Sequence, residues 1–416
     1  MESEGLPSDV KGAMAEFLDF DGSTKGMFAR YVNLYKTVGL DSRPCYEEIQ
    51  RLVRPKCNYS QKAIFDRFIS VRNKRPEYQS QDLEGTTIVI IGAGPVGLRS
   101  AIEVALLGGK AIVLEKRTDF TRPNILHLWT WIQYDLIGLG AKVVDPSFGA
   151  SSAFLHIGTR ELQIILYKVC LLIGVDVLFD YSFEDVRLSK DKAEVVAQHP
   201  KKGKTLFECD ALIECGGVHR PAADKIELEY QNIKMSDAIG MVASFENNKT
   251  REEILLKEFS WACQYNTGLF DDLKRVCRAK LENVVYYQGK VHYFICTPKR
   301  SNLIEEGVLE KIEGFDDSTR EGPLDGVTVN REAAAQYIGR ISKYFGVNTK
   351  LHGNPCIFDF SSRFNAQEPS RIIGDDSKGE MPFPVMVSGD ALLEPFWPEG
   401  LGIARGFLSA FDTVPV

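Results

Sequence analysis

The residues from 92 to 97 have the types and the spacing that bind a dinucleotide. Three glycines form the pattern G-x-G-x-x-G: Gly92, Gly94 and Gly97. The first permits a tight turn, the second lets the backbone approach a pyrophosphate, and the third lets a helix lie close to a strand. Val96, inside the pattern, contributes its backbone. An apolar strand at 88–91 precedes the pattern and an amphipathic helix follows it, so the sequence predicts a nucleotide-binding β-α-β unit.

Glu115 ends the second apolar strand of this unit, about 20 residues after the glycines. A carboxylate at that position accepts hydrogen bonds from both ribose hydroxyls of an adenosine and repels a 2′-phosphate. An exposed glutamate without a ligand is the alternative interpretation. The pocket is therefore predicted to suit FAD or NAD and to disfavour NADPH.

The stretch from Gly389 to Gly402 favours FAD over NAD. Asp390 follows an apolar strand at 384–388, where its carboxylate is placed to bond the ribityl chain of a flavin. The glycine-rich helix start at Gly402 would aim N–H groups at the pyrimidine edge, where negative charge builds on reduction. A nicotinamide dehydrogenase has no need of this segment. The pairing of both motifs predicts bound FAD.

Helices and strands that follow one another along the chain must position these motifs. Helical spacing of apolar residues runs from 14 to about 72, and a polar stretch from 73 to 84 precedes the β-α-β unit. Further along, a helix is predicted at 162–170, strands at 175–179, 193–197 and 205–214, mostly strands from 240 to 300, and a helix at 331–345.

This order predicts an α/β fold, with a Rossmann-like FAD-binding domain, an inserted, mostly β substrate domain and a helical N-terminal extension. The predicted boundaries are 1–84 for the helical extension, 85–230 for the first part of the FAD-binding domain, 231–372 for the β-sheet substrate domain and 373–416 for the return segment of the FAD-binding domain. We expect the return segment to stop before the closing helices of such a domain.

The composition narrows the class of protein. The net charge of the 416 residues is −7, which argues against nucleic acid as a partner. Nine dispersed cysteines form no C-x-x-C pair or His/Cys cluster, so no metal site is predicted. The first residues lack the pattern of a secretory signal, and no apolar run is long enough to cross a bilayer. A location in the cytoplasm, without a membrane span, is therefore expected.

The segment 51–75 is strongly basic although the net charge of the chain is negative, because Asp66 is the only acidic residue of the segment. Its basic residues are Arg51, Arg54, Lys56, Lys62, Arg67, Arg72, Lys74 and Arg75. One interpretation is a solvated helical face and linker. The other is a docking surface for an acidic protein partner.

Several longer motifs carry a resemblance to a known family. They are G-A-G-P-x-G-L-R-S-A-I-E from Gly92, V-L-E-K-R from Val113, R-P-N-I-L-H-L-W from Arg122, V-V-Y-Y to H-Y-F between 284 and 294, F-D-F at 358–360 and G-D-A-L-L-E-P-F-W-P from Gly389. Over roughly residues 17–413 the chain resembles the flavin monooxygenase domain of the MICAL proteins.

The resemblance implies the fold of p-hydroxybenzoate hydroxylase and an NADPH-dependent enzyme in the cytoplasm and at the cytoskeleton. Such an enzyme oxidises methionine on actin filaments, which promotes their disassembly, and releases hydrogen peroxide without its substrate. The residues at the family's FAD-contacting positions are Glu115, Arg117, Arg122, Asn124, Tyr293 and Asp390. Trp397 stands in the aromatic segment near the flavin ring, so Trp397 and Tyr293 are the candidate catalytic residues. Tyr293 lies in an alternating strand, so a plain core tyrosine is an equal alternative.

No second G-x-G-x-x-G is evident, which predicts a transient groove for NADPH instead of a second Rossmann domain. From their spacing around the flavin motifs, the expected contacts to its phosphates are Arg117, Arg122, His127 and Arg160.

The chain also departs from the family pattern. Val96 replaces a cysteine, Pro123 replaces an asparagine, and Cys215-Gly216-Gly217 stands where relatives carry Ala-Asp-Gly. The aspartate of that motif helps to hold FAD and NADPH in this class. Two other interpretations therefore stay open: a catalytically impaired flavin-fold protein that binds actin or another partner, and a flavin-free scaffold like the Rab GDP-dissociation inhibitors.

Overall fold

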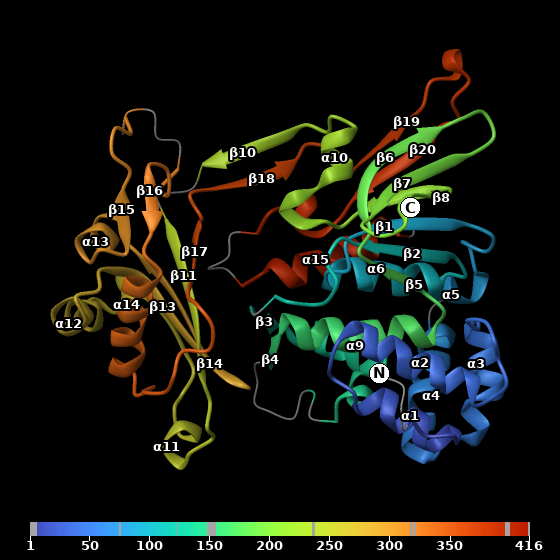
Figure 1. Cartoon of the computed structure of the whole chain (residues 1–416), viewed down its shortest axis with the longest axis horizontal. Helices are drawn as coiled ribbons and strands as arrows, with labels where there is room; N and C mark the ends of the chain where they lie inside the picture. The colour runs from blue at the N-terminus through green and yellow to red at the C-terminus, as the bar shows by residue number, and fades with distance from the viewer. Residues whose placement is uncertain are drawn as a thin grey trace. The chain divides into compact units, whose positions relative to one another are not determined.

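The structure, a computed structural model, describes residues 6–74, 76–122, 124–146, 148, 155–234, 238–316, 318, 322–395 and 400–414 (Figure 1). Two compact units divide the chain: Met1–Gln231 with Asn365–Val416, and Asn232–Phe364. Two segments cross between the units, β10 (Tyr230–Lys234) and β18 (Ser362–Ala366), and they pair in a two-stranded sheet. The sequence placed residues 365–372 in the substrate domain, whereas here they belong to the first unit.

A six-stranded sheet forms the centre of the first unit, with the strand order β19-β20-β9-β1-β2-β5. All neighbours pair in parallel except β19, which runs antiparallel to β20. The strands are β1 (Thr87–Ile91), β2 (Lys110–Glu115), β5 (Asp176–Phe179), β9 (Ala211–Glu214), β19 (Ser370–Ile373) and β20 (Phe383–Val387). The return segment thus adds β20 beside β9, so chain ends far apart in sequence share one sheet.

Alternating residues of β1 face two different layers. Ile88 and Ile90 join the hydrophobic core that the helices form, whereas Val89 and Ile91 join the core beneath a second, antiparallel sheet. The strands of that second sheet are β6 (Ser182–Leu188), β7 (Ala193–His199) and β8 (Gly203–Glu208). Burial on both faces explains why β1 reads as a continuous apolar run.

Most helices of the first unit cover one face of the six-stranded sheet, whereas α10 (Pro221–Lys225) places Ala222 in the core on the other face. Those nearest the nucleotide motifs are α6 (Pro95–Leu106), α7 (Thr130–Gly138), α8 (Ala141–Val144), α9 (Thr159–Leu172) and α15 (Gly402–Thr413). A short antiparallel pair, β3 (Ile125–Leu128) and β4 (Leu155–Gly158), lies between them in the chain. The apolar stripes of α6, α9 and α15 enter one common core.

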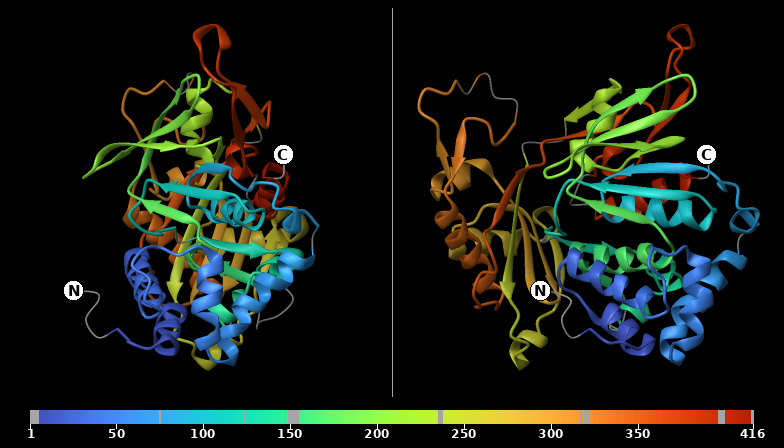
Figure 2. Two further views of the ribbon diagram at one scale, coloured as in Figure 1. Left: turned by 90° about the vertical axis from the view of Figure 1, so that its right-hand side faces the viewer. Right: turned by 45° about the vertical axis from the view of Figure 1, so that its right-hand side comes forward.

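The N-terminal helices belong to the first unit and share this core. They are α1 (Val10–Asp19), α2 (Thr24–Lys36), α3 (Tyr46–Leu52), α4 (Tyr59–Lys74) and α5 (Pro76–Ser80), with the 3₁₀ turn η1 (Arg54–Lys56). In Figures 1 and 2 the blue N-terminal helices lie against α9, and α2 contacts α9 while α4 contacts α7 and α8. The predicted extension is helical, but Phe17 and Tyr31 are buried in the core of the first unit.

The second unit is a five-stranded antiparallel sheet with helices on one face. Its strand order is β12-β13-β14-β11-β17, and the strands are β11 (Ile239–Glu246), β12 (Phe259–Ala262), β13 (Leu281–Gln288), β14 (Val291–Pro298) and β17 (Cys356–Asp359). The other elements are α11 (Arg251–Ile254), α12 (Thr267–Cys277), α13 (Arg300–Glu305), α14 (Arg331–Tyr344) and the hairpin of β15 (Leu309–Lys311) and β16 (Val327–Val329). Helix α12 interrupts the run of strands predicted from 240 to 300, because Phe270, Leu273 and Cys277 form an apolar stripe at helical spacing.

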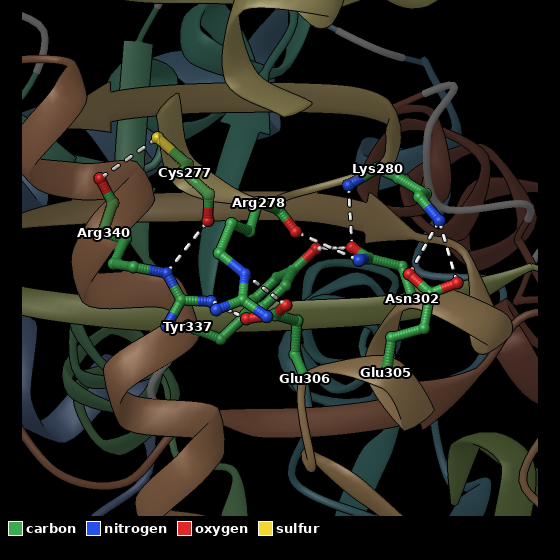
Figure 3. A network of polar contacts seen from close by, with 8 residues as sticks. All are labelled: Cys277, Arg278, Lys280, Asn302, Glu305, Glu306, Tyr337 and Arg340. Carbon is green, nitrogen blue, oxygen red and sulfur yellow. Dashed lines mark hydrogen bonds and ion pairs between the residues drawn. The ribbon is translucent and has the colours of Figure 1, made fainter. Parts of the chain in front are cut away.

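A polar network closes the end of α12 (Figure 3). Asn302 Oδ1 accepts hydrogen bonds from the Lys280 N–H at 2.7 Å and from the Tyr337 hydroxyl at 2.9 Å, and Asn302 Nδ2 donates to the carbonyl of Arg278 at 3.0 Å. The φ of Arg278 is +58°, so this residue ends the helix in the left-handed region. The network therefore satisfies backbone groups that the helix end leaves open.

Within the described ranges, no helix is long and apolar enough to cross a membrane. The same residues contain no group of three or more His, Cys, Asp or Glu side chains suited to a metal ion.

Candidate cofactor site

The glycine loop joins the carboxyl end of β1 to the first turn of α6. The φ of Gly92 is +96°, and a Cβ atom added there would lie 2.7 Å from the carbonyl oxygen of Cys215. A Cβ atom added at Gly97 would lie 2.0 Å from the carbonyl oxygen of Gly92. In a close-packed interior, backbone atoms cannot move away from such overlaps without a large cost in free energy. Gly92 and Gly97 therefore provide the turn and the close approach of helix to strand.

Gly94 has a different environment from the other two glycines. Its φ of −67° is accessible to any residue, and a Cβ atom added there would meet nothing within 4 Å. Gly94 is the N-cap of α6, and no side chain caps the helix at this end. The first N–H groups of α6 and the positive end of its dipole are thus suited to an anion such as a pyrophosphate.

Glu115, at the carboxyl end of β2, is buried. Its Oε2 accepts a hydrogen bond from the Ala93 N–H at 2.9 Å, and its Oε1 accepts one from the Arg117 N–H at 2.9 Å. Each carboxylate oxygen can accept a second hydrogen bond. Glu115 can therefore fix the glycine loop and still bind ribose hydroxyls.

A small, shallow hollow opens beside Glu115. Its lining residues are Glu115, Arg117, Asp119, Phe120, Thr121, Arg122 and Gln163. Gln163, on α9, is 5% exposed, and its Nε2 donates to the carbonyl of Ala93 at 2.7 Å. Its Oε1 has no hydrogen-bond partner among the residues that the structure describes. Since buried amide oxygens are normally hydrogen-bonded, this acceptor fits a donor of a ligand, such as a ribose hydroxyl.

The sequence did not predict a role for Gln163. The signal was a polar residue at a buried position of an apolar stripe, beside Leu162, Ile165 and Leu166. A buried polar side chain usually has a hydrogen-bond partner.

Asp390 lies in the turn η6 (Gly389–Ala391), directly after β20. Gly389 has a φ of +68°, and its N–H donates to the Ser409 hydroxyl of α15 at 2.8 Å. Burial raises the pKa of Asp390 to about 6, and the positive charge of Arg122 opposes this shift. The structure therefore brings two predicted site residues, Arg122 and Asp390, near enough to interact electrostatically.

Val96 connects α6 with the return segment. A Cβ atom added at Gly406 would lie 2.5 Å from Val96 Cγ2, and one added at Gly389 would lie 3.1 Å from either Val96 methyl group. The valine side chain therefore fills the space between α6, η6 and α15, besides the backbone role that the sequence predicts. Helix α15 begins at Gly402, and like α6 it has no side-chain cap at its N-terminus.

Comparison with known proteins identifies the family of this chain. Residues 237–359 match the family described as the Mical Rossman domain. The F-actin monooxygenase mical1 of Danio rerio is 35% identical over 382 residues, which are 88% of this chain and 30% of the relative. MICAL1 of Homo sapiens is 35% identical over 430 aligned residues, with 98% of this chain and 39% of the relative covered. The chain belongs to the MICAL family.

The match extends to the F-actin monooxygenase Mical of Drosophila melanogaster, which is 35% identical over 395 residues, 91% of this chain and 8% of that relative. The chain thus spans well under half the length of these MICAL relatives.

Solved structures show the same fold. The p-nitrophenol 4-monooxygenase PnpA of Pseudomonas putida DLL-E4 matches with a TM-score of 0.51 at 15% identity, covering 79% of each chain. Aklavinone-11 hydroxylase, solved with FAD and aklavinone, matches with a TM-score of 0.53 at 12% identity, covering 80% of this chain and 62% of that one. The predicted fold class, a Rossmann-like FAD-binding domain of the p-hydroxybenzoate hydroxylase type, is confirmed.

The residues carried over from the MICAL motifs differ in their surroundings. Arg160 donates to the carbonyls of Asp21 and Gly22 at 2.9 and 2.6 Å, so its guanidinium already binds the segment between α1 and α2. The carbonyl of Asn124 accepts from the Thr159 N–H at 2.8 Å, which ties the start of β3 to α9. The role of either side chain in binding a cofactor stays a prediction.

The two candidate catalytic residues of the MICAL resemblance are Tyr293 and Trp397. Tyr293 belongs to β14 of the second unit, on the opposite face of the strand from Phe294 and Cys296, which enter the core of that unit. Trp397 lies outside the described residues. Their contacts with a flavin stay predictions.

Proposed function

We propose that the chain is an FAD-dependent monooxygenase that is reduced by NADPH and oxidises methionine on actin filaments. The observation that carries the proposal is the convergence of two nucleotide motifs on one sheet. The glycine loop follows β1, the Asp390 turn follows β20, and β9 pairs with both strands. The names of the MICAL relatives, F-actin monooxygenases, support the substrate.

The residues of the first unit fit FAD. The N-terminus of α6, open at Gly94, would hold the pyrophosphate, and Glu115 would hold the adenosine ribose. The free acceptor of Gln163 and the carboxylate of Asp390 would bond hydroxyl or amino groups of the ligand. When bound, FAD supplies the redox chemistry, because it accepts a hydride from NADPH and reacts with dioxygen.

The side chains of this chain then have to bind and orient FAD and the substrate, and keep water away from them. A thioether sulfur is itself a nucleophile, so methionine oxidation needs no nucleophilic side chain from the protein. Asp390, with a pKa of about 6, is mostly ionised at neutral pH and acts as a hydrogen-bond acceptor. Tyr293 and Trp397 are the residues that we propose to line the reacting centre.

The experiment is to purify the chain and measure bound flavin, NADPH oxidation with and without actin filaments, and methionine sulfoxide in actin by mass spectrometry. We expect a yellow protein with one FAD, faster NADPH consumption with filaments, and peroxide formation without them. Gly94→Trp is the matched control, since it should remain folded without flavin. Stoichiometric flavin with no filament effect on NADPH consumption, and no sulfoxide, would contradict the proposed activity.

A catalytically impaired partner-binding module is the second candidate. It is favoured by Gly217 in the segment Cys215-Gly216-Gly217, where the family resemblance implies Ala-Asp-Gly. Filament binding in a sedimentation assay, without NADPH turnover, is the result that supports it. A purified protein without flavin absorbance would instead support the flavin-free scaffold.

The basic segment 51–75 is the surface that we propose for an acidic protein partner, in a cytoplasmic, cytoskeletal setting. Arg51, Lys56 and Arg67 are exposed. Arg54 donates from Nε to Asp66 at 3.0 Å, so the single acid of the segment is already paired. The exposed charges on α3, η1 and α4 are thus left for a partner of opposite charge.

A further inference from the structure

Glu214 is a buried carboxylate at the carboxyl end of β9, between the two strands that carry the nucleotide motifs. It pairs in register with Ile91 of β1, the last residue before the glycine loop, and with Val387 of β20. Its carbonyl oxygen accepts a hydrogen bond from the Ser388 N–H at 3.0 Å, and its side chain is fully buried. Glu214 therefore lies at the junction of the glycine loop and the turn η6.

The carboxylate of Glu214 organises the segment that follows β9. Its Oε1 accepts a hydrogen bond from the Gly216 N–H at 2.6 Å, and its Oε2 accepts one from the Ala222 N–H at 2.7 Å. The two bonds close a loop that contains η2 (Gly217–His219) and the start of α10 (Pro221–Lys225).

This loop contacts the turn that carries Asp390. The guanidinium of Arg220 lies 3.8 Å from the centre of the Tyr230 ring, and the Tyr230 hydroxyl donates to the carbonyl of Ala391 at 2.7 Å. Turn η2 also packs against η6. A change at Glu214 would therefore reach the backbone beside Asp390.

The absence of a side chain at Gly216 leaves room for the Glu214 carboxylate. A Cβ atom added at Gly216 would lie 2.7 Å from Oε1 of Glu214, which is closer than a carbon and an oxygen can pack. An aspartate side chain there would also place a second carboxyl group beside a buried one. A side chain at position 216 therefore requires the Glu214 carboxylate, or the loop that it holds, to shift.

We propose that Glu214 is a positioning residue of the cofactor site. It acts through the Gly216–Ala222 loop, which its carboxylate holds beside the Asp390 turn. The inference rests on the proposed function, because the site that Glu214 serves is the proposed FAD site.

The test is a double-mutant cycle with Gly216→Asp, Glu214→Ala and the two combined. Gly217→Asp is the matched control, because a Cβ atom at Gly217 meets nothing within 4 Å and aspartate tolerates its φ of +68°. The readouts are the FAD dissociation constant and the melting midpoint of the apoprotein. Glu214→Gln, which keeps the side-chain volume, serves if Glu214→Ala does not fold.

We expect Gly216→Asp to weaken FAD binding about tenfold or more, and the combined variant to bind within about threefold of Glu214→Ala alone, a coupling typical of groups in contact. Gly217→Asp should combine additively with Glu214→Ala. Wild-type affinity in Gly216→Asp, or additive effects of the two changes, would overturn the inference. If the unmodified protein binds no FAD, the proposed function fails, while the coupling between the two positions is still measured by the apoprotein melting midpoints.

Discussion

Substitutions at Gly97 and Gly94 should separate the two tasks of the glycine loop, stability and cofactor binding. Gly97→Ala places a Cβ atom against the carbonyl of Gly92, whereas Gly94→Trp places a side chain in open space at the N-terminus of α6. The first change should lower the stability of the protein even without a ligand. The second should leave the apoprotein stable and abolish FAD retention.

The magnitude follows from the distance. The added Cβ atom at Gly97 would lie 2.0 Å from the Gly92 carbonyl oxygen, whereas favourable contacts begin at about 3.5 Å. Helix α6 must therefore shift away from β1 by more than an ångström. Overpacking of this kind costs about 1–3 kcal/mol, which corresponds to a fall in melting temperature of roughly 2–4 °C per kcal/mol for a unit of this size. Gly94 has an ordinary φ of −67°, so its substitution should cost little.

The assay is thermal unfolding of each variant, with and without excess FAD, together with flavin absorbance after gel filtration. Gly94→Ala is the control for Gly97→Ala, because the added methyl group is the same and meets nothing within 4 Å. We expect the melting temperature of Gly94→Ala to equal that of the unmodified apoprotein and that of Gly97→Ala to be lower.

Two results would refute this reasoning. Equal melting temperatures of Gly97→Ala and the unmodified apoprotein would mean that the helix does not approach the strand as closely as the structure shows. Stoichiometric flavin in Gly94→Trp would mean that no pyrophosphate lies beside Gly94.

Three further predictions concern buried polar groups. Glu115→Ala leaves two backbone N–H groups without their acceptor, at about 1–3 kcal/mol for each group that stays buried, and we expect FAD affinity by fluorescence titration to fall at least tenfold. Asn302→Ala should lower the urea midpoint, because it also leaves buried polar groups without their hydrogen-bond partner. The control is Lys280→Met, which removes only an exposed ion pair with Glu305 and should change stability by less than about 1 kcal/mol. Equal effects of the two substitutions would contradict the assigned network. Burial, reinforced by the charge of Asp224, raises the pKa of Glu214 from 4.5 to about 7, so its contribution to stability is fully present below about pH 4.5 and is lost as the pH rises through about 7. Unfolding at pH 5 and pH 8 should therefore show a stability loss in the unmodified protein that Glu214→Gln lacks, and a parallel pH dependence would contradict the pKa shift.

The sequence by itself determined the elements whose requirements are local. A glycine turn between an apolar strand and an amphipathic helix predicts the loop from Gly92 to Gly97, because tight turns and close backbone contacts restrict residue type directly. Glu115 and Asp390 were predicted in the same way, since each lies at the end of an apolar run that predicts a buried parallel strand. The fold class followed from the order of these elements.

Only the tertiary structure decided the contacts between distant segments. Gln163 comes to the glycine loop because α9 packs on α6, and Val96 meets Gly406 because the return segment packs on the same helix. Arg160 binds carbonyls between α1 and α2, and the Glu214 carboxylate occupies the space beside Gly216. These choices depend on which surfaces meet after the chain has folded, and no local pattern of residue types records that geometry.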